Sequence, residues 1–286
     1  MRTRIITSIV ALAIFIPFLV FSGEPSFVFV TATSILSLVA VYEVTKCTGF
    51  FKKPVLCIIP YAASVGINVM ARYMEEKESF FVYTALILFA LSFYFMVCAV
   101  LSKGSIKPSD AAISAVMTAY ITLSFAMLTL LRDFTAEGVA VGARLYLLSF
   151  IFAWMPDIGG YFAGRAFGKH KLIPDVSPKK TVEGFIGGIL FSVIAAAVFC
   201  LVTGATGYGY LIIMPLSVFC AVISVCGDLI ASLVKRYYGI KDYGVIFPGH
   251  GGVMDRFDSV IAVAPFIYTV CYFLTEASLL SAPLFR

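Results

Sequence analysis

The sequence contains few charged residues and few histidines. Only 13% of its 286 residues are charged, and only two are histidines. The net charge of +5 is too small and too localised to predict nucleic-acid binding. No stretch outside the apolar runs is long enough to form a separate soluble domain. The composition therefore argues against a nucleic-acid-binding protein and against a soluble enzyme.

The cysteines also lack a pattern. There are seven of them, an odd number, and none are paired with the C-x-x-C spacing. Most lie within apolar runs, where free thiols pack as small hydrophobic side chains. Neither a structural zinc site nor a disulfide framework is expected.

Long apolar runs are what the sequence has in abundance. Hydrophobic residues make up 61% of the chain and the mean hydropathy is +1.00, whereas about 45–50% is usual for a soluble domain. Runs of about 20 residues can cross the hydrocarbon layer as helices. We therefore expect an all-α, polytopic transmembrane bundle that forms a single integral membrane domain over residues 1–286. About nine spans are expected: Ile5–Phe21, Ser26–Thr45, Pro54–Met70, Phe80–Leu101, Ala111–Leu131, Val139–Ala163, Phe185–Thr203, Tyr210–Val234 and Val260–Leu280.

The basic residues predict which side of the membrane each loop faces. If the N-terminus is cytoplasmic, 16 of the 21 Lys and Arg residues lie on the cytoplasmic side. The other five are Arg72, Lys77, Arg132, Arg144 and Arg286. This excess satisfies the positive-inside rule. We therefore expect a multi-pass protein of the inner, cytoplasmic membrane.

The two longest cytoplasmic segments, which follow the sixth and eighth runs, are also the most polar. Polar groups gathered on one side of the membrane indicate a site at that interface rather than a pathway through it. The inverted repeats with broken helices that are typical of transporters are not evident. We expect residues 1–138 to form scaffold spans and residues 139–286 to form catalytic spans whose site faces the cytoplasm.

Asp228 lies inside an otherwise apolar run. A carboxylate within a span is costly and normally faces a partner or a water-filled cavity. On a helix, Ser224, Asp228 and Ser232 share one face, and Lys235 follows on that face. Two interpretations stay open here: a structural Asp228–Lys235 pair between helices, or a metal or phosphate site that opens to the cytoplasm.

The residues downstream favour the second interpretation. Glycines surround His250 and allow backbone amides to approach an anion closely, while the histidine donates to phosphate or acts as a base. Asp255 and Asp258 share a face if the ninth helix begins there, and paired carboxylates suit Mg²⁺. Carboxylates and cations in one segment predict phosphoryl or nucleotidyl transfer. The cations are Lys235, Arg236, Lys241 and Arg256.

The second polar segment begins at Asp157, which is either a ligand or base, or a helix-packing residue. Three glycines at four-residue spacing, from Gly160 to Gly168, predict close helix packing. The spacing of the glycines and lysines excludes a Walker A loop. Glu43, in the second span, is another intramembrane carboxylate, for which only pairing with a nearby Lys or Arg is predicted.

Residues 177–181 follow in the same polar segment. Their sequence, Ser-Pro-Lys-Lys-Thr, predicts a basic turn that opens the seventh helix, with Thr181 as its N-cap. The positive end of that helix would attract a phosphate. Lys179 and Lys180 then either guide a substrate headgroup or set the topology and attract anionic lipids.

The segment from Ser232 to Asp258 resembles the signature of the phosphatidate cytidylyltransferase family, also called CDP-diacylglycerol synthases. It reads Ser-Leu-Val-Lys-Arg at 232–236, Lys-Asp at 241–242 and Pro-Gly-His-Gly-Gly-Val-Met-Asp-Arg-Phe-Asp at 248–258. Residues 4–7, 157–161 and 177–181 are similar to family stretches too. The second to fifth spans resemble the family only in hydropathy.

The resemblance implies a nucleotidyltransferase of phospholipid biosynthesis. CTP and phosphatidic acid would give CDP-diacylglycerol and pyrophosphate, with Mg²⁺ required and a second cation allowed. We assign Asp228, Asp255 and Asp258 to the metal and, together with Lys235, to catalysis. The residues assigned to substrate phosphates are Ser232, Arg236, Lys241, His250, Gly251, Gly252, Arg256, Lys179 and Lys180.

Three other functions stay open. A lipid kinase that uses CTP would leave CDP instead of pyrophosphate, and a related cytidylyltransferase would act on a different lipid phosphate. A transporter of anionic substrates would need polar residues in both halves of the membrane, and the second to fifth spans have few. The sequence does not determine the oligomeric state, and a homodimer is allowed.

Overall fold

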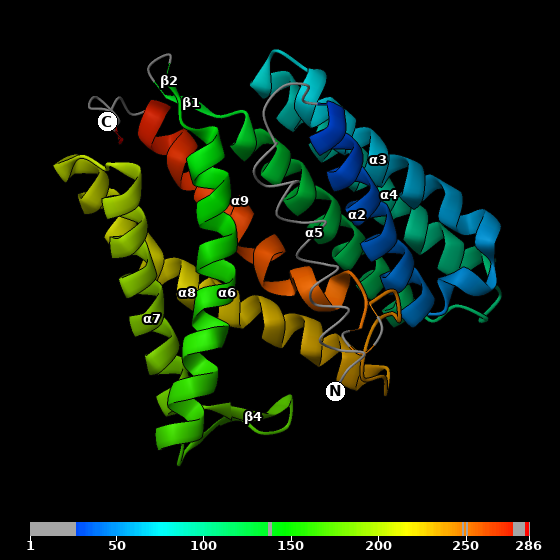
Figure 1. Ribbon diagram of the computed structural model, residues 1–286. Coiled ribbons are helices and arrows are strands. Elements are labelled where there is room, and N and C mark those ends of the chain that lie inside the picture. Colours follow the sequence, from blue (N-terminus) through cyan, green and yellow to red (C-terminus); the bar gives the residue numbers. More distant parts are fainter. Residues whose placement is uncertain (1–26, 137–138, 248, 250, 277–283, 286) are drawn as a thin grey trace. The chain divides into compact units, whose positions relative to one another are not determined.

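The computed structural model describes residues 27–136, 139–247, 249, 251–276 and 284–285, and this part of the chain is mostly helical (Figure 1). Eight helical segments in it are long and apolar enough to cross a membrane. The helices are α2 (Phe27–Cys47), η1 (Phe50–Lys52), η2 (Pro54–Cys57), α3 (Ile58–Tyr73), α4 (Lys77–Leu101), α5 (Pro108–Arg132), α6 (Gly142–Phe167), α7 (Val182–Thr203), α8 (Gly207–Tyr237) and α9 (Met254–Glu276).

The expected all-α, multi-pass membrane fold is confirmed. Each predicted span from the second to the ninth corresponds to one of the eight helical segments, and the predicted first span, Ile5–Phe21, lies outside the described residues. The largest difference is at α9, which begins at Met254 instead of Val260. Hydropathy missed this turn because it contains Asp255 and Asp258, which are polar although they are helical.

The chain forms two compact units. The first contains the described residues up to Thr129 together with Tyr237–Arg256, and the second contains Leu130–Arg236 and the described residues from Phe257 onwards. Helix α9 begins in the first unit and continues into the second. Each unit is thus formed by two segments that are distant in sequence.

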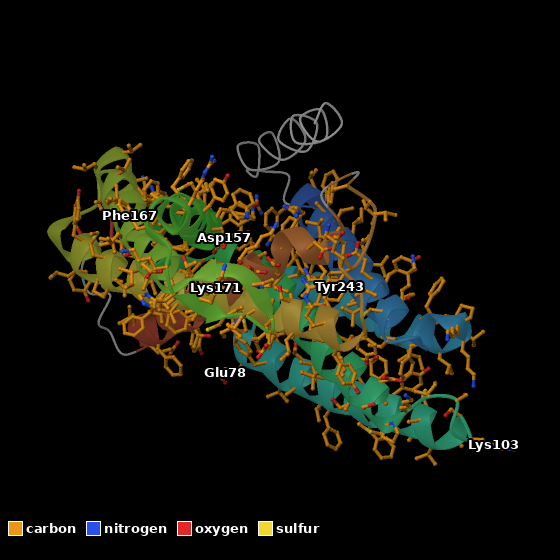
Figure 2. The ribbon with its side chains drawn as sticks, turned by 90° about the horizontal axis from the view of Figure 1, so that it is seen from below. Glu78, Lys103, Asp157, Phe167, Lys171 and Tyr243 are labelled. Atoms are coloured by element: carbon orange, nitrogen blue, oxygen red, sulfur yellow. The ribbon has the colours of Figure 1, made fainter. Side chains whose placement is uncertain are left out.

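In the first unit, α2 packs on α3 and α3 packs on α4. Part of the apolar core lies where η1 and η2 meet α4, with the rings of Phe50 and Phe95 5.0 Å apart in an edge-to-face arrangement. Helix α4 leaves large apolar side chains exposed, including Leu86, Phe89 and Phe93. Exposed apolar side chains on a helix of this length are expected where it faces lipid, and Figure 2 shows many carbon-rich side chains projecting from the ribbons.

In the second unit, α6 and α7 lie side by side over most of their lengths (Figure 1). Glycines allow this close contact. A Cβ atom at Gly160 would lie 3.3 Å from the Gly184 carbonyl oxygen, and one at Gly164 would lie 2.9 Å from Thr181 Oγ1 and 3.5 Å from the Gly184 Cα atom. The glycine spacing that predicted helix packing is thereby confirmed.

A small antiparallel hairpin joins α6 to α7. Strand β3 (Lys171–Ile173) pairs with β4 (Ser177–Thr181), so the predicted basic turn at residues 177–181 is wrong, because the backbone pairs as a strand. The predicted N-cap is confirmed, since Thr181 Oγ1 accepts a hydrogen bond from the Gly184 amide at 3.1 Å. A second short pair, β1 (Thr135–Ala136) and β2 (Val139–Ala140), precedes α6.

Candidate active site

Helix α8 presents Asp228 among small polar side chains. Ser232 Oγ donates to Asp228 Oδ1 at 3.3 Å, one helical turn away. One turn in the other direction, Ser224 Oγ donates to the Ala153 carbonyl of α6 at 2.8 Å. The predicted polar face of this helix therefore exists, and at Ser224 it contacts α6.

Lys180 contacts two carboxylates at the end of the hairpin. Its Nζ atom lies 2.6 Å from Asp228 Oδ2 and 3.9 Å from Asp157 Oδ1. Lys180 is the penultimate residue of β4 and directly precedes Thr181, the N-cap of α7, so the strand and the start of α7 fix its backbone. Figure 2 labels Asp157 on α6 and Lys171 on the strand that pairs with β4. The ammonium group thus joins α6, β4 and α8.

Helices α8 and α9 cross closely beside Asp228. A Cβ atom at Gly227 would lie 2.6 Å from the Asp258 carbonyl oxygen and 2.6 Å from the Ala262 side chain. At the same crossing Ser259 Oγ donates to the Ser224 carbonyl at 3.2 Å. Because Gly227 has no side chain, the backbones of α8 and α9 touch at this point. Asp228 directly follows Gly227, and the Asp258 carbonyl group is part of the contact, so both carboxylates belong to residues at the crossing.

Asp258 is 9% exposed, and its Oδ1 accepts a hydrogen bond from the Ser259 amide at 2.8 Å. The charged groups that act on it within its unit are Asp228, Lys235 and Asp157. Lys235 is likewise 9% exposed. The second unit therefore gathers acidic and basic side chains from α6, β4, α8 and α9, which are far apart in sequence.

The first unit holds Asp255, the third of the predicted metal ligands. Asp255 Oδ2 accepts hydrogen bonds from the Tyr243 amide at 2.7 Å and from the Gly252 amide at 2.9 Å. Asp255 was predicted to bind metal with Asp228 and Asp258. In this conformation it holds the backbone of the signature segment, and its metal role stays a prediction.

Glycines shape this segment. Gly249 and Gly251 have φ of 79° and 86°, in the left-handed region that side chains disfavour. A Cβ atom at Gly251 would also lie 2.6 Å from Asp255 Oδ2. The Gly252 amide already donates to Asp255. For Gly252 to bind phosphate as predicted, its amide would have to exchange Asp255 for the phosphate or donate to both. His250 lies outside the described residues.

The remaining predicted phosphate-binding residues are accessible. Lys179, Lys241 and Arg256 are exposed, and so is Arg236, whose Nε donates to the Val176 carbonyl at 3.4 Å. This contact connects the end of α8 with the hairpin within the second unit.

Sequence reasoning left two acidic residues without an assigned role. Asp157 was named as a ligand, a base or a packing residue, and it shares Lys180 with Asp228. Glu43 was expected to pair with a Lys or Arg, and its carboxylate instead accepts hydrogen bonds from two backbone amides, those of Val253 and Met254. The signal available in the sequence was the same for both: a carboxylate inside an apolar run.

The donor atoms can be compared with what Mg²⁺ requires. Among the described residues, no group of three or more His, Cys, Asp and Glu side chains is arranged to hold a metal ion. Magnesium in phosphate-transfer sites, however, needs only one or two carboxylates, because substrate phosphates and water complete its shell. Asp228 and Asp258, at the crossing of α8 and α9, provide oxygen ligands of this kind. The residues present therefore fit Mg²⁺.

Comparisons with known proteins identify the family of the chain. A model of the cytidylyltransferase family matches residues 2–274. A phosphatidate cytidylyltransferase of Staphylococcus haemolyticus is 32% identical over 272 residues, which are 93% of this chain and 97% of that protein. Proteins with the same name from Staphylococcus epidermidis and Staphylococcus aureus are both 33% identical, over 267 and 269 residues, with the same coverage.

The similarity extends over nearly the whole length of both chains and is not confined to the signature. It includes the apolar spans that resembled the family only in hydropathy, as well as the hairpin that carries Lys180. A transporter or a structural membrane protein is not expected to match an enzyme family in this way. The chain is a multi-pass membrane enzyme that belongs to the cytidylyltransferase family.

Proposed function

We propose that this enzyme transfers the cytidylyl group of CTP to phosphatidic acid, giving CDP-diacylglycerol and pyrophosphate. The observation that carries the proposal is the Lys180 ammonium group shared by Asp228 and Asp157, beside Asp258 on the crossing helix. This group of residues contains both a cation for phosphate and carboxylates for a metal. The names of the relatives support phosphatidic acid as the lipid.

The reaction joins two anions. An oxygen of the lipid phosphate attacks the α-phosphorus of CTP and forms a new P–O bond. The bond from the α-phosphorus to the oxygen that bridges to the β-phosphorus breaks, and that oxygen leaves with pyrophosphate. Because the attacking phosphate is already ionised, no strong general base is needed.

The main barrier that the protein must lower is repulsion between phosphates. Two like charges 4 Å apart cost about 1 kcal/mol in water and several times more where the dielectric constant is lower. Lys180 and Lys235 are cations of the second unit, and Arg236 and Lys241 are exposed cations at and after the end of α8. We assign these residues to the phosphates of CTP and of the lipid.

The carboxylates have a separate role in the proposal. Asp228 and Asp258 would hold Mg²⁺, which when bound supplies further neutralisation of phosphate charge. Ser232, which donates to Asp228, orients that carboxylate. Catalysis is thus assigned to residues within 139–286, with residues 1–138 as the membrane scaffold.

One assay tests the reaction. Purified protein is incubated with α-³²P-labelled CTP, phosphatidic acid and Mg²⁺, and the products are separated into lipid and water-soluble fractions. The proposal requires label in the lipid and an equal amount of pyrophosphate. CDP with no label in the lipid would identify a CTP-dependent lipid kinase, and label that appears only with a different lipid phosphate would change the substrate. Chelation of divalent cations should stop the reaction.

We also propose that the site faces the cytoplasm of an inner-membrane protein. The excess of basic residues at that side in the predicted topology supports this orientation. Asp175 lies in the exposed hairpin, so a cysteine there, in a cysteine-free background, should react with a membrane-impermeant maleimide in inverted vesicles and not in intact cells. The opposite pattern would reverse the orientation.

A further inference from the structure

Glu43 is a buried carboxylate that the proposed reaction does not use. It lies near the end of α2 and is 1% exposed. Its two oxygens accept hydrogen bonds from consecutive backbone amides, Oε1 from Val253 at 3.0 Å and Oε2 from Met254 at 2.8 Å. Met254 is the first residue of α9. A side chain from the scaffold half of the sequence therefore caps the helix that carries the acidic residues of the signature.

The carboxylate also explains two glycines. Cβ atoms at Gly244 and Gly252 would each overlap the Glu43 carboxylate, and the three atoms nearest to a Cβ at Gly252 all belong to Glu43. In these positions a glycine is required because the Glu43 side chain lies directly against the backbone. The two glycines of this segment therefore leave the space that the Glu43 side chain of α2 occupies. Figure 1 draws the end of α2 beside the start of α9.

Asp255 completes the arrangement within the first unit. It accepts hydrogen bonds from the Tyr243 and Gly252 amides, so Glu43 and Asp255 together hold four amides of the signature segment. Helix N-termini have unsatisfied amides that favour a negative partner. Buried amides without acceptors are costly, and the segment would therefore change conformation if Glu43 were removed.

We propose that Glu43 is a positioning residue for CTP. It fixes Gly251–Met254 in the shape in which this segment receives the triphosphate, and it does so without touching the substrate. The inference rests on the proposed function, because it takes CTP as the ligand of the signature segment. The lipid substrate is not expected to depend on Glu43 in the same way.

The main experiment separates the two substrates. Glu43→Gln keeps the size of the side chain but replaces one acceptor oxygen with an NH₂ group, which cannot accept a hydrogen bond from an amide. We expect the KM for CTP to rise by about 10- to 100-fold, as for other residues that orient a ligand-contacting group. The KM for phosphatidic acid should stay within about twofold, since a role confined to positioning for CTP leaves lipid binding unchanged.

A matched control is available on the same helix. Ser37 is fully buried in α2, and its hydroxyl has no hydrogen-bond partner among the described residues. Ser37→Ala should leave both KM values unchanged. A purely structural Glu43 would lower the amount of folded enzyme without changing either KM, and equal changes in both KM values would also overturn the proposal.

A double-mutant cycle tests the contact itself. Gly252→Ala should lower the thermal midpoint of the wild-type protein because the new methyl group overlaps Glu43. In a Glu43→Ala background the same substitution should have a clearly smaller effect, since the overlapping atoms are gone. Additive effects would show that Glu43 does not hold this segment.

The outcome can be distinguished from failure of the proposed reaction. If the wild-type protein forms no labelled lipid, equilibrium binding of labelled CTP replaces the KM measurement. Weaker CTP binding by Glu43→Gln would then support the positioning role while the proposed reaction fails. Unchanged CTP binding, or no CTP binding by the wild type, would overturn the inference.

Discussion

The two units use carboxylates in different ways. In the first unit, Glu43 and Asp255 accept hydrogen bonds from backbone amides of the signature segment. In the second unit, Asp228 and Asp157 share the ammonium group of Lys180, whose side chain is 21% exposed. The residue types are the same in both units, and the partners differ.

The difference in partners has a physical consequence. Backbone amides at a helix start cannot move away without unfolding the turn, so the carboxylates that accept from them are fixed. A lysine has a long flexible side chain, so its ammonium group can exchange one anionic partner for another. We therefore assign structural positioning to Glu43 and Asp255, which accept from amides of the signature segment, and chemistry to Asp228, which Lys180 contacts, and to Asp258 at the same helix crossing. Three predictions test this division, and a fourth tests a tyrosine–carboxylate hydrogen bond of the first unit.

The largest effect is expected at the crossing of α8 and α9. Asp228→Asn and Asp258→Asn should each lower turnover by roughly 10²- to 10³-fold, as when one electrostatic group of an active site is lost. Protein yield and thermal midpoint should change little, because Asn retains the shape and an acceptor oxygen. Turnover is measured as labelled lipid formed.

Asp242→Asn is the matched control, because this carboxylate is exposed and lies in the same signature segment. It should retain wild-type turnover. If Asp228→Asn or Asp258→Asn is equally active, that residue does not hold a metal ion, and the division between the units fails for it.

Adjacent lysines provide the second comparison. Lys180→Gln should lower turnover by about 100-fold, because it removes the cation held by Asp228 and Asp157. Lys179 is exposed, and Lys179→Gln should cost less than about fivefold, since an exposed charge contributes at most about 1 kcal/mol. Initial rates at saturating substrate distinguish the two variants. Equal losses of turnover would mean that both lysines contribute only a general positive surface charge, and that the contact of Lys180 with Asp228 and Asp157 has no specific role.

Asp255 tests the other side of the division. Asp255→Ala should lower the free energy of unfolding by about 1–3 kcal/mol, because the amides of Tyr243 and Gly252 lose their acceptor. Asp242→Ala, next to Tyr243, should have no such effect. Chemical denaturation in detergent micelles measures the difference. Separately, near-normal turnover of Asp255→Asn would refute the metal role predicted from the sequence.

The smallest effect concerns a hydrogen bond after the end of α8. Tyr238 Oη donates to Asp110 Oδ1 at 2.9 Å, and Tyr238→Phe should lower the free energy of unfolding by about 1 kcal/mol at pH 7. Burial, with the bond to Asp110, raises the pKa of Tyr238 above the ordinary value of 10.0. The stabilisation is therefore complete below about pH 10 and is lost as the pH rises through the folded pKa.

The pH dependence gives this last prediction its control. The difference between wild type and Tyr238→Phe should narrow above pH 10, as the unfolded wild-type chain ionises. Tyr237→Phe removes an exposed neighbouring hydroxyl and should change neither the stability at pH 7 nor its dependence on pH. A constant difference across the alkaline range would mean that the hydroxyl is not held as the structure places it.

The sequence predicted the spans well because hydropathy is a local property. A run of apolar residues must be helical within a bilayer, since each backbone amide has to find its partner inside the segment. Hydropathy failed where polarity and helix coincide, at the first turn of α9. It also gave no information on the pairing of residues 177–181 with Lys171–Ile173, because strand pairing depends on a partner elsewhere in the chain.

By itself, the sequence determined the class of protein, the eight described spans within a few residues, and the segment that carries the family signature. These properties depend on residue type and on short-range spacing. Only the tertiary structure decided which partner each acidic residue has. Lys180 reaches Asp228 across 48 positions, and Glu43 accepts from Met254 across 211. Such contacts depend on which helices cross and at which turn. A local pattern such as the glycine spacing predicts that a helix packs closely, but it does not say against which partner.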